Sequence, residues 1–434
     1  MRRSRYTIVC DSGKGEHLLY NTAFGSFALL DDDAFAQFEA CGGPLAAQML
    51  DAGFLTDLEA DEELVAQEAN FQSACEDEHD FYLVVAPTYA CNLRCPYCYE
   101  QGHNSIKGKM SNEVIEATIR FVQARYAEKP FKRVSVQWYG GDPSLALDVV
   151  EDLSNRLIAW CDGQGLEYTA MMLTNCNLID EPSVEMLVRA RVEAVYMTID
   201  GFEDTHNARR VSAVGLNSYE RNIEAAKLFV KHGIKAMATM NVDRVNWPEF
   251  HPLRDMLRDE IGIDLSAGRL CDYGHFFGTR DFKKPEFDLF EHDEFSRMTH
   301  DEFALGGYGA DDIRDMLQPV PRFCNGQRHN YYIVDTLGDV YICDGYIGER
   351  DHVVFNVKDE PTPGQLRLVS HNPYESEQCR SCHLVPICQG NCDWERRASD
   401  MACHPLLTTL PDYLRDWRNC FEVEAEGYIR LDTR

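Results

Sequence analysis

Residues 87–99 read Pro-Thr-Tyr-Ala-Cys-Asn-Leu-Arg-Cys-Pro-Tyr-Cys-Tyr, and they follow an apolar run, Phe81–Ala86, that is typical of a buried strand. The loop contains a CxxxCxxC triplet, Cys91, Cys95 and Cys98. Cysteine is the usual ligand of iron–sulfur clusters, and three thiolates on one loop can hold three irons of a cubic four-iron cluster. Zinc is the alternative, but zinc sites usually take four protein ligands, and no fourth cysteine stands nearby. The spacing therefore favours a cluster whose fourth iron is open to another ligand.

The composition narrows the kinds of partner. The chain has 434 residues, which is too long for one ordinary hydrophobic core, so we expect two or three domains. Its formal net charge of −30 argues against nucleic acid as a partner, because phosphate backbones are bound by clustered Lys and Arg. The same charge is compatible with a basic peptide partner.

The N-terminus predicts no export or membrane insertion. It is basic, but the run that follows is interrupted by Cys10, Asp11 and Ser12 and has no signal-peptide core. No uninterrupted apolar run approaches membrane-spanning length. We therefore expect a cytoplasmic protein with no membrane partner. In that reducing compartment the 17 cysteines favour metal ligation over disulfides.

Strand and helix periodicities alternate from Phe81 onward, which is the pattern of a parallel sheet covered by helices. Helical spacing runs through Ile115–Tyr126, with Ser111 as the expected N-cap, and through Tyr219–His232. About six strand–helix units are expected, fewer than in a complete eight-stranded barrel. Residues 80–270 are thus predicted to form an α/β fold, a partial (β/α)6 TIM barrel. Its expected strands are Phe81–Ala86, Val134–Trp138, Tyr168–Leu173, Ala194–Ile199, Lys235–Val242 and Ile263–Leu265.

Three further segments flank this barrel. Residues 1–75 are expected to form a small α+β domain, residues 271–320 an irregular bridge, and residues 321–434 a cysteine-rich domain. Within the first segment we expect strands at Tyr6–Cys10 and Leu18–Tyr20, a helix at Asp31–Cys41, a further element at Leu45–Phe54 and an acidic connector at Glu59–Glu68.

Chemically distinctive residues follow the predicted strands. In barrels of this kind the active residues lie in the loops after the carboxyl ends of the strands, so these loops share one face. Glycines there let the backbone approach a ligand closely. The loops are Gly140-Gly141-Asp142-Pro143 after the second strand, Thr174-Asn175-Cys176 after the third, and Asp200-Gly201 after the fourth.

With Tyr97 before its last cysteine, the triplet resembles the radical S-adenosylmethionine (radical SAM) superfamily. The resemblance implies that SAM fills the open iron site and is cleaved reductively to an adenosyl radical. Gly140, Gly141 and Asp142 resemble the family's GGEP motif, with Asp in place of Glu. Thr174-Asn175-Cys176 is similar to a Thr-Asn-Gly segment, and the resemblance extends to a Ser-x-Asp-Gly stretch and a following Arg. The implied SAM-binding residues are Tyr97, Gly140, Gly141, Asp142, Thr174, Asn175, Thr198, Asp200 and Arg210.

The C-terminal region carries a second set of cysteines. Cys379-x2-Cys382 and Cys388-x3-Cys392 alone fit a tetrahedral zinc site, although zinc leaves Cys324, Cys343 and Cys403 unexplained. A hairpin is predicted from strands at Tyr331–Val334 and Val340–Ile342.

The order of these cysteines is similar to the SPASM domain, a module with two auxiliary clusters. The resemblance assigns Cys324, Cys343 and Cys392 to the first auxiliary cluster, with an open iron unless Cys271 reaches it. It assigns Cys379, Cys382 and Cys388 to the second, with Cys403 favoured over Cys420 as the last ligand. Three 4Fe–4S clusters and SAM are then the implied cofactors.

The combined resemblance implies a peptide-modifying maturase, and the N-terminal segment is similar in size and pattern to small winged peptide-recognition domains. The expected reaction is hydrogen abstraction from a ribosomal precursor peptide to form a thioether or carbon–carbon crosslink, with a reductant such as flavodoxin or ferredoxin. One alternative is a sulfatase maturase that forms formylglycine, in which Asp344 matches the general base. A zinc-stabilised peptide-binding adaptor is the alternative without chemistry.

Overall fold

The computed structural model describes residues 1–11, 16–76, 79–98, 100, 108–270, 287–305, 309–392, 394, 403–404, 406–421 and 430–432. It forms two compact units. One unit comprises residues 77–290 and 328–370, and the other comprises residues 1–76, 291–327 and 371–434. We call them the barrel unit and the cysteine-rich unit. Residues 328–370 thus group with the barrel, although residues 321–434 were expected to form one domain.

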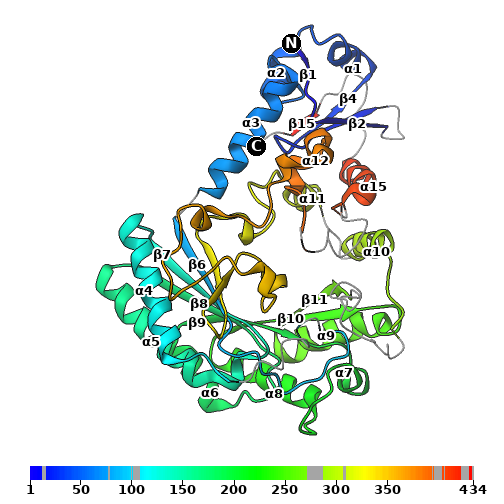
Figure 1. Cartoon of the computed structure of the whole chain (residues 1–434). Coiled ribbons are helices and arrows are strands. Elements are labelled where there is room, and N and C mark those ends of the chain that lie inside the picture. The colour runs from blue at the N-terminus through cyan, green and yellow to red at the C-terminus, as the bar shows by residue number, and fades with distance from the viewer. Residues whose placement is uncertain are drawn as a thin grey trace. The chain divides into compact units, whose positions relative to one another are not determined.

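The barrel unit is built on a nine-stranded sheet whose order is β11-β10-β9-β8-β7-β6-β12-β13-β14. Its strands β6 to β11 are labelled in Figure 1. Six of its strands are consecutive along the chain and pair in parallel, as expected for a partial (β/α)6 barrel. They are β6 (Asp80–Val85), β7 (Arg133–Trp138), β8 (Glu167–Leu173), β9 (Val192–Thr198), β10 (Lys235–Val242) and β11 (Asp264–Arg269).

The register of the sheet aligns the carboxyl ends of its strands. Val85 lies opposite Trp138, and Trp138 lies opposite Met172. Farther along the sheet, Thr198 at the end of β9 lies opposite Thr239 of β10. The loops that follow β6, β7, β8 and β9 therefore leave the sheet at one edge, where the sequence predicted the active residues.

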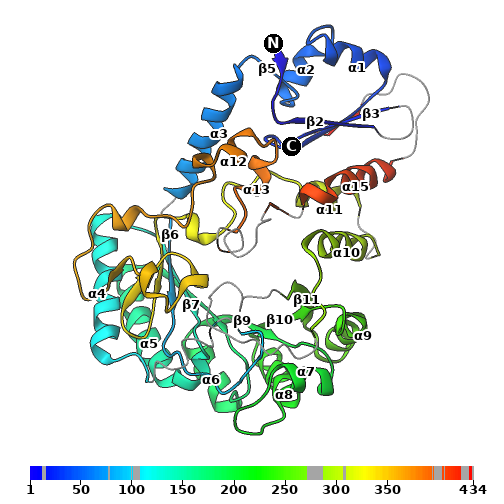
Figure 2. The same ribbon diagram turned by 45° about the vertical axis from the view of Figure 1, so that its right-hand side comes forward.

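Helices connect the strands and cover the outer face of this sheet (Figure 2). Ser111 caps the first of them as predicted, because its side chain accepts a hydrogen bond from the Val114 backbone. The helices are α4 (Asn112–Glu128), α5 (Leu147–Gln164), α6 (Glu181–Arg189), α7 (Glu203–Arg209), α8 (Ser218–Lys231) and α9 (Phe250–Met256).

The predicted hairpin near residue 337 is confirmed. Strands β12 (Tyr331–Val334) and β13 (Asp339–Tyr341) pair antiparallel, and β14 (Phe355–Asn356) pairs with β13. The strand pattern of residues 331–342 did not predict that β12 also pairs in parallel with β6. Two aromatic residues, Phe81 and Tyr332, stack across this junction with ring centroids 5.5 Å apart. The hairpin therefore extends the barrel sheet beyond its first strand.

The cysteine-rich unit contains a four-stranded antiparallel sheet with the order β15-β4-β3-β2. Its strands are β2 (Thr7–Asp11), β3 (His17–Asn21), β4 (Ser26–Leu30) and β15 (Arg430–Asp432), and a small pair adds β1 (Arg2–Arg3) and β5 (Leu55–Thr56). Helices α1 (Asp32–Glu39) and α2 (Ala46–Asp51) follow β4 along the chain. Near the sheet, Phe27 stacks on Trp417 of helix α15 (Leu406–Asn419), with ring centroids 4.7 Å apart.

Two expectations for this unit were wrong. The acidic connector Glu59–Glu68 lies in helix α3 (Ala60–Cys75), because Glu59 and Glu62 form a capping box and acidic residues suit a helix N-terminus. The irregular bridge 271–320 contains two helices, α10 (His292–Leu305) and α11 (Ala310–Met316). Helix α11 buries Ile313 in a cluster with Trp417, and this packing overrides weak local signals. Short helices α12 (Glu377–Ser381) and α13 (Val385–Cys388) complete the unit.

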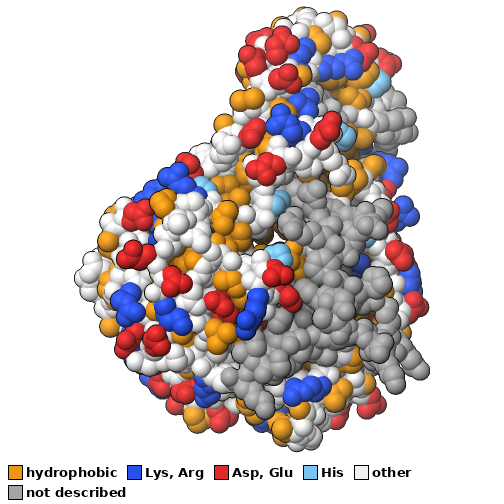
Figure 3. Space-filling model, viewed as in Figure 1, with side chains coloured by type: hydrophobic (Ala, Val, Ile, Leu, Met, Phe, Trp, Pro, Cys, Tyr) orange, Lys and Arg blue, Asp and Glu red, His pale blue; other side chains and the backbone are white. Residues whose placement is uncertain are grey.

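Charges of both signs are interspersed on the face of the barrel unit around α4 and α5 (Figure 3). Arg156 lies between Asp152 and Glu116, and Lys109 pairs with Asp148. This face therefore presents no single-sign patch. None of the described helices combines the length and apolar character that a membrane crossing requires.

Candidate active site

A cavity of about 380 Å³ opens at the carboxyl edge of the barrel sheet. The three thiols of the triplet line it together with residues from the ends of β7 to β11. Its walls are Cys91, Leu93, Cys95, Tyr97, Cys98, Glu100, Tyr139, Gly140, Gly141, Leu173, Thr174, Asn175, Tyr196, Met197, Thr198, Arg210, Thr239, Asn241, Arg269 and Leu270. The donor set suits an iron–sulfur cluster, because three cysteines from one loop face a space that other residues enclose.

The cysteine loop is braced from the third strand. Asn175 Nδ2 donates to Asn92 Oδ1 at 2.7 Å and lies 3.5 Å from Cys91 Sγ. Burial, with Asp142 nearby, raises the pKa of Cys91 to about 11, and burial also raises the pKa values of Cys95 and Cys98. These thiols stay protonated until a metal displaces the protons.

The two glycines of the second loop contact the cysteine loop. A Cβ atom on Gly141 would lie 2.3 Å from the Tyr89 carbonyl oxygen and 2.5 Å from that of Ala90. Gly140 has a φ of 101°, and its Cβ would lie 2.7 Å from the Thr88 carbonyl oxygen. We expected these glycines to let the backbone approach a ligand. Here they allow two loops of the protein to pack together, which positions the cysteines.

Asp142 joins the second and third loops. Its carboxylate accepts hydrogen bonds of 2.6 Å from both Thr174 Oγ1 and Ser144 Oγ. Burial raises the pKa of this carboxyl, while the hydrogen bonds act in the opposite direction. The predicted acceptor is therefore already occupied by two hydroxyl groups of the protein.

Tyr97, Asp200 and Arg210 form a buried group beside the triplet. The Tyr97 hydroxyl donates to the Asp200 carboxylate, and Arg210 Nη1 donates to the Tyr97 hydroxyl at 3.0 Å. Arg210 Nε has no hydrogen-bond partner among the described residues, and the residue is only 9% exposed. The sequence motifs thus converge here, and Arg210 presents a cation to the cavity.

Two neighbouring residues have structural roles. The Asp200 backbone N–H donates to His206 Nδ1 at 3.3 Å, and His206 Nε2 lies 3.2 Å from Ser218 Oγ. Burial, with Arg210 nearby, lowers the pKa of His206 to about 3, so the ring is neutral. Cys176 has a φ of 62°, a conformation that suits the glycine of the Thr-Asn-Gly pattern.

Sequence reasoning missed several side chains of this cavity, among them Glu100 and Tyr139. Burial, with Asp344 and Asp142 nearby, raises the pKa of Glu100 to about 7. Burial also raises the pKa of Tyr139, to which Asp344 contributes. Asp344 is itself buried, which raises its pKa. The candidate base therefore lies near both missed residues, and only the position of Glu100 two residues after Cys98 could have drawn attention to it.

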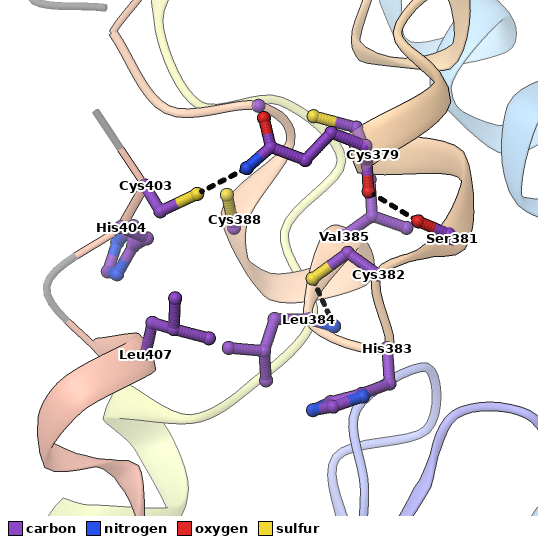
Figure 4. A pocket seen from close by; sticks show the side chains of 12 residues that line it. Cys379, Ser381, Cys382, His383, Leu384, Val385, Cys388, Cys403, His404 and Leu407 are labelled. Carbon is purple, nitrogen blue, oxygen red and sulfur yellow. Dashed lines mark hydrogen bonds between the residues drawn. The ribbon is translucent and has the colours of Figure 1, made fainter. Parts of the chain in front are cut away.

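A second pocket, of about 250 Å³, lies in the cysteine-rich unit. Its lining includes four of the predicted ligands, Cys379, Cys382, Cys388 and Cys403, whose thiols surround one space in Figure 4. The Leu384 backbone N–H donates to Cys382 Sγ, and Gln378 Nε2 donates to Cys403 Sγ, both at 3.3 Å.

The other predicted cysteine ligands are divided between the units. Cys324 and Cys392 belong to the cysteine-rich unit, and Cys343 belongs to the barrel unit. Within the cysteine-rich unit, Gln327 Nε2 donates to the Gln389 carbonyl at 3.0 Å and so joins the segments that carry Cys324 and Cys392. Cys271 lies outside the described residues.

The chain is similar to known proteins in sequence and fold. Residues 85–257 match the model of the Radical SAM superfamily. A cysteine-type anaerobic sulfatase-maturating enzyme of Clostridium perfringens is 24% identical over 380 residues, which cover 80% of this chain and 97% of that protein. The PqqA peptide cyclase of Gluconobacter oxydans is 26% identical over 328 residues, or 71% of this chain and 84% of the relative.

A solved structure shares the fold. The structure of native anSMEcpe with bound AdoMet and Cp18Cys peptide superposes with a TM-score of 0.59 at 20% identity, covering 78% of this chain and 99% of that one. The mostly parallel α/β sheet of the barrel unit is a radical SAM core, similar to the fold of that structure. The chain contains a radical SAM domain and is a radical SAM enzyme, which implies SAM and a 4Fe–4S cluster as cofactors.

Proposed function

We propose that this enzyme modifies a peptide or protein substrate, and that Cys91, Cys95 and Cys98 hold the cluster to which SAM binds. The observation that carries the proposal is the cavity in which the triplet shares its walls with the loops after the other strands. Bound there, the cluster would supply the electron for reductive cleavage of SAM, and the chemistry would be hydrogen abstraction from a substrate. The loops around the cavity would hold that substrate beside the triplet and exclude water.

The residues of the chain divide this work among them. Arg210 would pair with the SAM carboxylate, since the residue is buried and lines the cavity. Thr198 and Asn175 would contact SAM from the same walls, and the backbone of Gly140 and Gly141 would accept hydrogen bonds from its ammonium group. Tyr97, Asp200, Asp142 and Thr174 hold these groups in position through the hydrogen bonds described above.

The substrate class follows from the relatives. One relative matures sulfatases and another cyclises a peptide, so both act on a peptide or a protein. Crosslinking of a precursor peptide through a thioether or carbon–carbon bond is our first choice. Formylglycine formation in a sulfatase is the second candidate, favoured by Asp344 near the cavity. A neighbouring reading frame for a short cysteine-bearing peptide supports the first, and one for a sulfatase supports the second.

Metal and product analysis tests the proposal. We expect the protein purified without air to contain about twelve irons per chain, as three cubic clusters require. With dithionite and SAM it should release deoxyadenosine, and flavodoxin or ferredoxin should replace dithionite. Stoichiometric zinc with little iron and no deoxyadenosine would identify the zinc-stabilised adaptor instead.

The second pocket predicts which late cysteine binds metal. Cys403 lines the pocket with Cys379, Cys382 and Cys388, whereas Cys420 is exposed beyond helix α15. We expect Cys403→Ala to lose about four irons per chain and Cys420→Ala to lose none. Iron analysis with Mössbauer spectroscopy measures both, and iron loss in the Cys420 variant alone would reverse the assignment.

Asp344 is expected to act as the base in either enzymatic reaction. Asp344→Asn should lower product formation by about 10²- to 10⁴-fold, because a positioned base contributes that much to a proton transfer. SAM cleavage should continue, since the substitution leaves the triplet intact. Mass spectrometry of a cysteine-containing sulfatase peptide, together with deoxyadenosine assay, separates the two effects. Product formation at the wild-type rate would remove Asp344 from the mechanism.

A further inference from the structure

Glu100 is a buried residue with one carboxylate oxygen that no described residue hydrogen-bonds. The residue is 8% exposed and lines the cavity together with the cysteine triplet. Its Oε1 atom has no hydrogen-bond partner among the residues that the structure describes. Leaving a polar atom buried without a partner is unfavourable, so such an atom in a cavity wall indicates a ligand that supplies the missing donor.

The charges around Glu100 indicate what kind of donor is missing. The ionisable groups that act most strongly on it are Asp344 and Asp142, and both are acidic. Asp142 already accepts hydrogen bonds from Thr174 and Ser144, so its carboxylate is occupied. Arg210 also lines the cavity, and its described side-chain hydrogen bond goes to Tyr97 rather than to Glu100. A positively charged donor from a ligand would offset the negative charge on this side of the cavity, and a neutral donor would not.

We propose that the Glu100 carboxylate binds a primary ammonium group of a ligand in this cavity. The inference rests on the proposed function, which supplies two sources of such a group. One source is the α-ammonium of SAM, and the other is a lysine side chain of the peptide substrate. The net charge of −30 favours basic peptides in general, and Glu100 provides a specific position for one.

Equilibrium binding of SAM to the reconstituted, unreduced enzyme tests the first source. If SAM provides the ammonium, Glu100→Gln should weaken SAM binding by about 10- to 100-fold, which is the effect of losing one charged hydrogen bond. A SAM analogue without the amino group should bind equally well to the wild type and the variant. The Glu116→Gln variant is the control, because Glu116 is an exposed carboxylate on α4 and its loss changes the net charge equally.

Dialysis against Nα-acetyl-lysine amide, with SAM at saturation, tests the second source. The neutral probe of the same shape is Nα-acetyl-norleucine amide. If the substrate provides the ammonium, wild-type enzyme should retain the lysine probe at least about tenfold better than the norleucine probe, and Glu100→Gln should abolish the difference. Physiological salt suppresses nonspecific attraction to the acidic surface.

Suppose that Glu100→Gln, with its cluster assembled, binds both SAM and the lysine probe as tightly as the wild type does. That result would overturn the inference and leave the proposed function intact. A wild-type enzyme that prefers neither SAM over its desamino analogue nor lysine over norleucine would overturn it as well, and that comparison requires no variant. Failure of the proposed function would appear earlier, as absence of the cluster or of SAM binding in the wild type.

Discussion

Replacing Cys91, Cys95 and Cys98 together by alanine is expected to abolish SAM cleavage, with deoxyadenosine formation falling to the background of a sample without enzyme, because the cofactor carries this chemistry. The three cysteines line one cavity, and among the described residues they are the cysteines that could bind a cluster there. About four irons per chain should be lost, and the remaining iron should stay with the auxiliary clusters. Anaerobic iron analysis and chromatography of the products measure the two effects.

Cys161 provides the matched control for this variant. It is a fully buried cysteine on helix α5 of the same unit, and burial raises its pKa above the usual range. Cys161→Ala should keep wild-type iron content and deoxyadenosine formation, at a modest cost in stability. Wild-type deoxyadenosine formation in the triple variant would show that SAM is cleaved elsewhere, and the proposed function would fail.

Gly141→Ala is expected to damage the site without removing any ligand. The new Cβ would lie 2.3 Å from one backbone carbonyl oxygen and 2.5 Å from the next, at Tyr89 and Ala90. Neither atom belongs to a flexible side chain, so the cysteine loop must move. We expect the free energy of unfolding to fall by about 3 kcal/mol. The melting temperature of the barrel unit should drop by roughly 5–10 °C, and cluster incorporation should fall with it.

Gly163→Ala is the control for this steric prediction. Gly163 lies in helix α5, and a Cβ there would meet nothing within 4 Å. Alanine is the better helix former, so this variant should be as stable as the wild type or more stable by about 0.5–1 kcal/mol. Calorimetry of the two variants and the wild type, with iron content measured in parallel, checks both expectations. Equal stability of Gly141→Ala and the wild type would mean that the two loops do not pack together as described.

The periodicity of the chain was enough to predict the barrel. All six parallel strands lie within a few residues of their predicted positions, because a buried strand requires a short apolar or alternating run whatever surrounds it. Local patterns failed at α3, α10 and α11. The acidic run of α3 resembles a solvated connector, and the helix depends on its capping box and on distant partners, such as the pairing of Arg2 with Glu63.

The candidate site was predictable wherever a motif is contiguous in the chain. The triplet was found from its spacing, and the two glycines and Thr174-Asn175 from their places after predicted strands and their resemblance to family motifs; all of them line the cavity. The roles of Asp142 and Gly141 were not predictable, because they depend on which loop meets which. The sequence gives no sign that Thr174 donates to Asp142, or that the Gly141 backbone lies against Tyr89.

The sequence alone determined the chemistry of this protein, since ligand type and spacing along one loop decide whether an iron–sulfur cluster can form there. Only the tertiary structure decided how the site is organised around that loop. Glu100 became a candidate ligand-binding residue because folding buries its carboxyl group near Asp344, which lies 244 positions away along the chain. Burial and electrostatic proximity are properties of the folded chain, and no pattern of neighbouring residues encodes them.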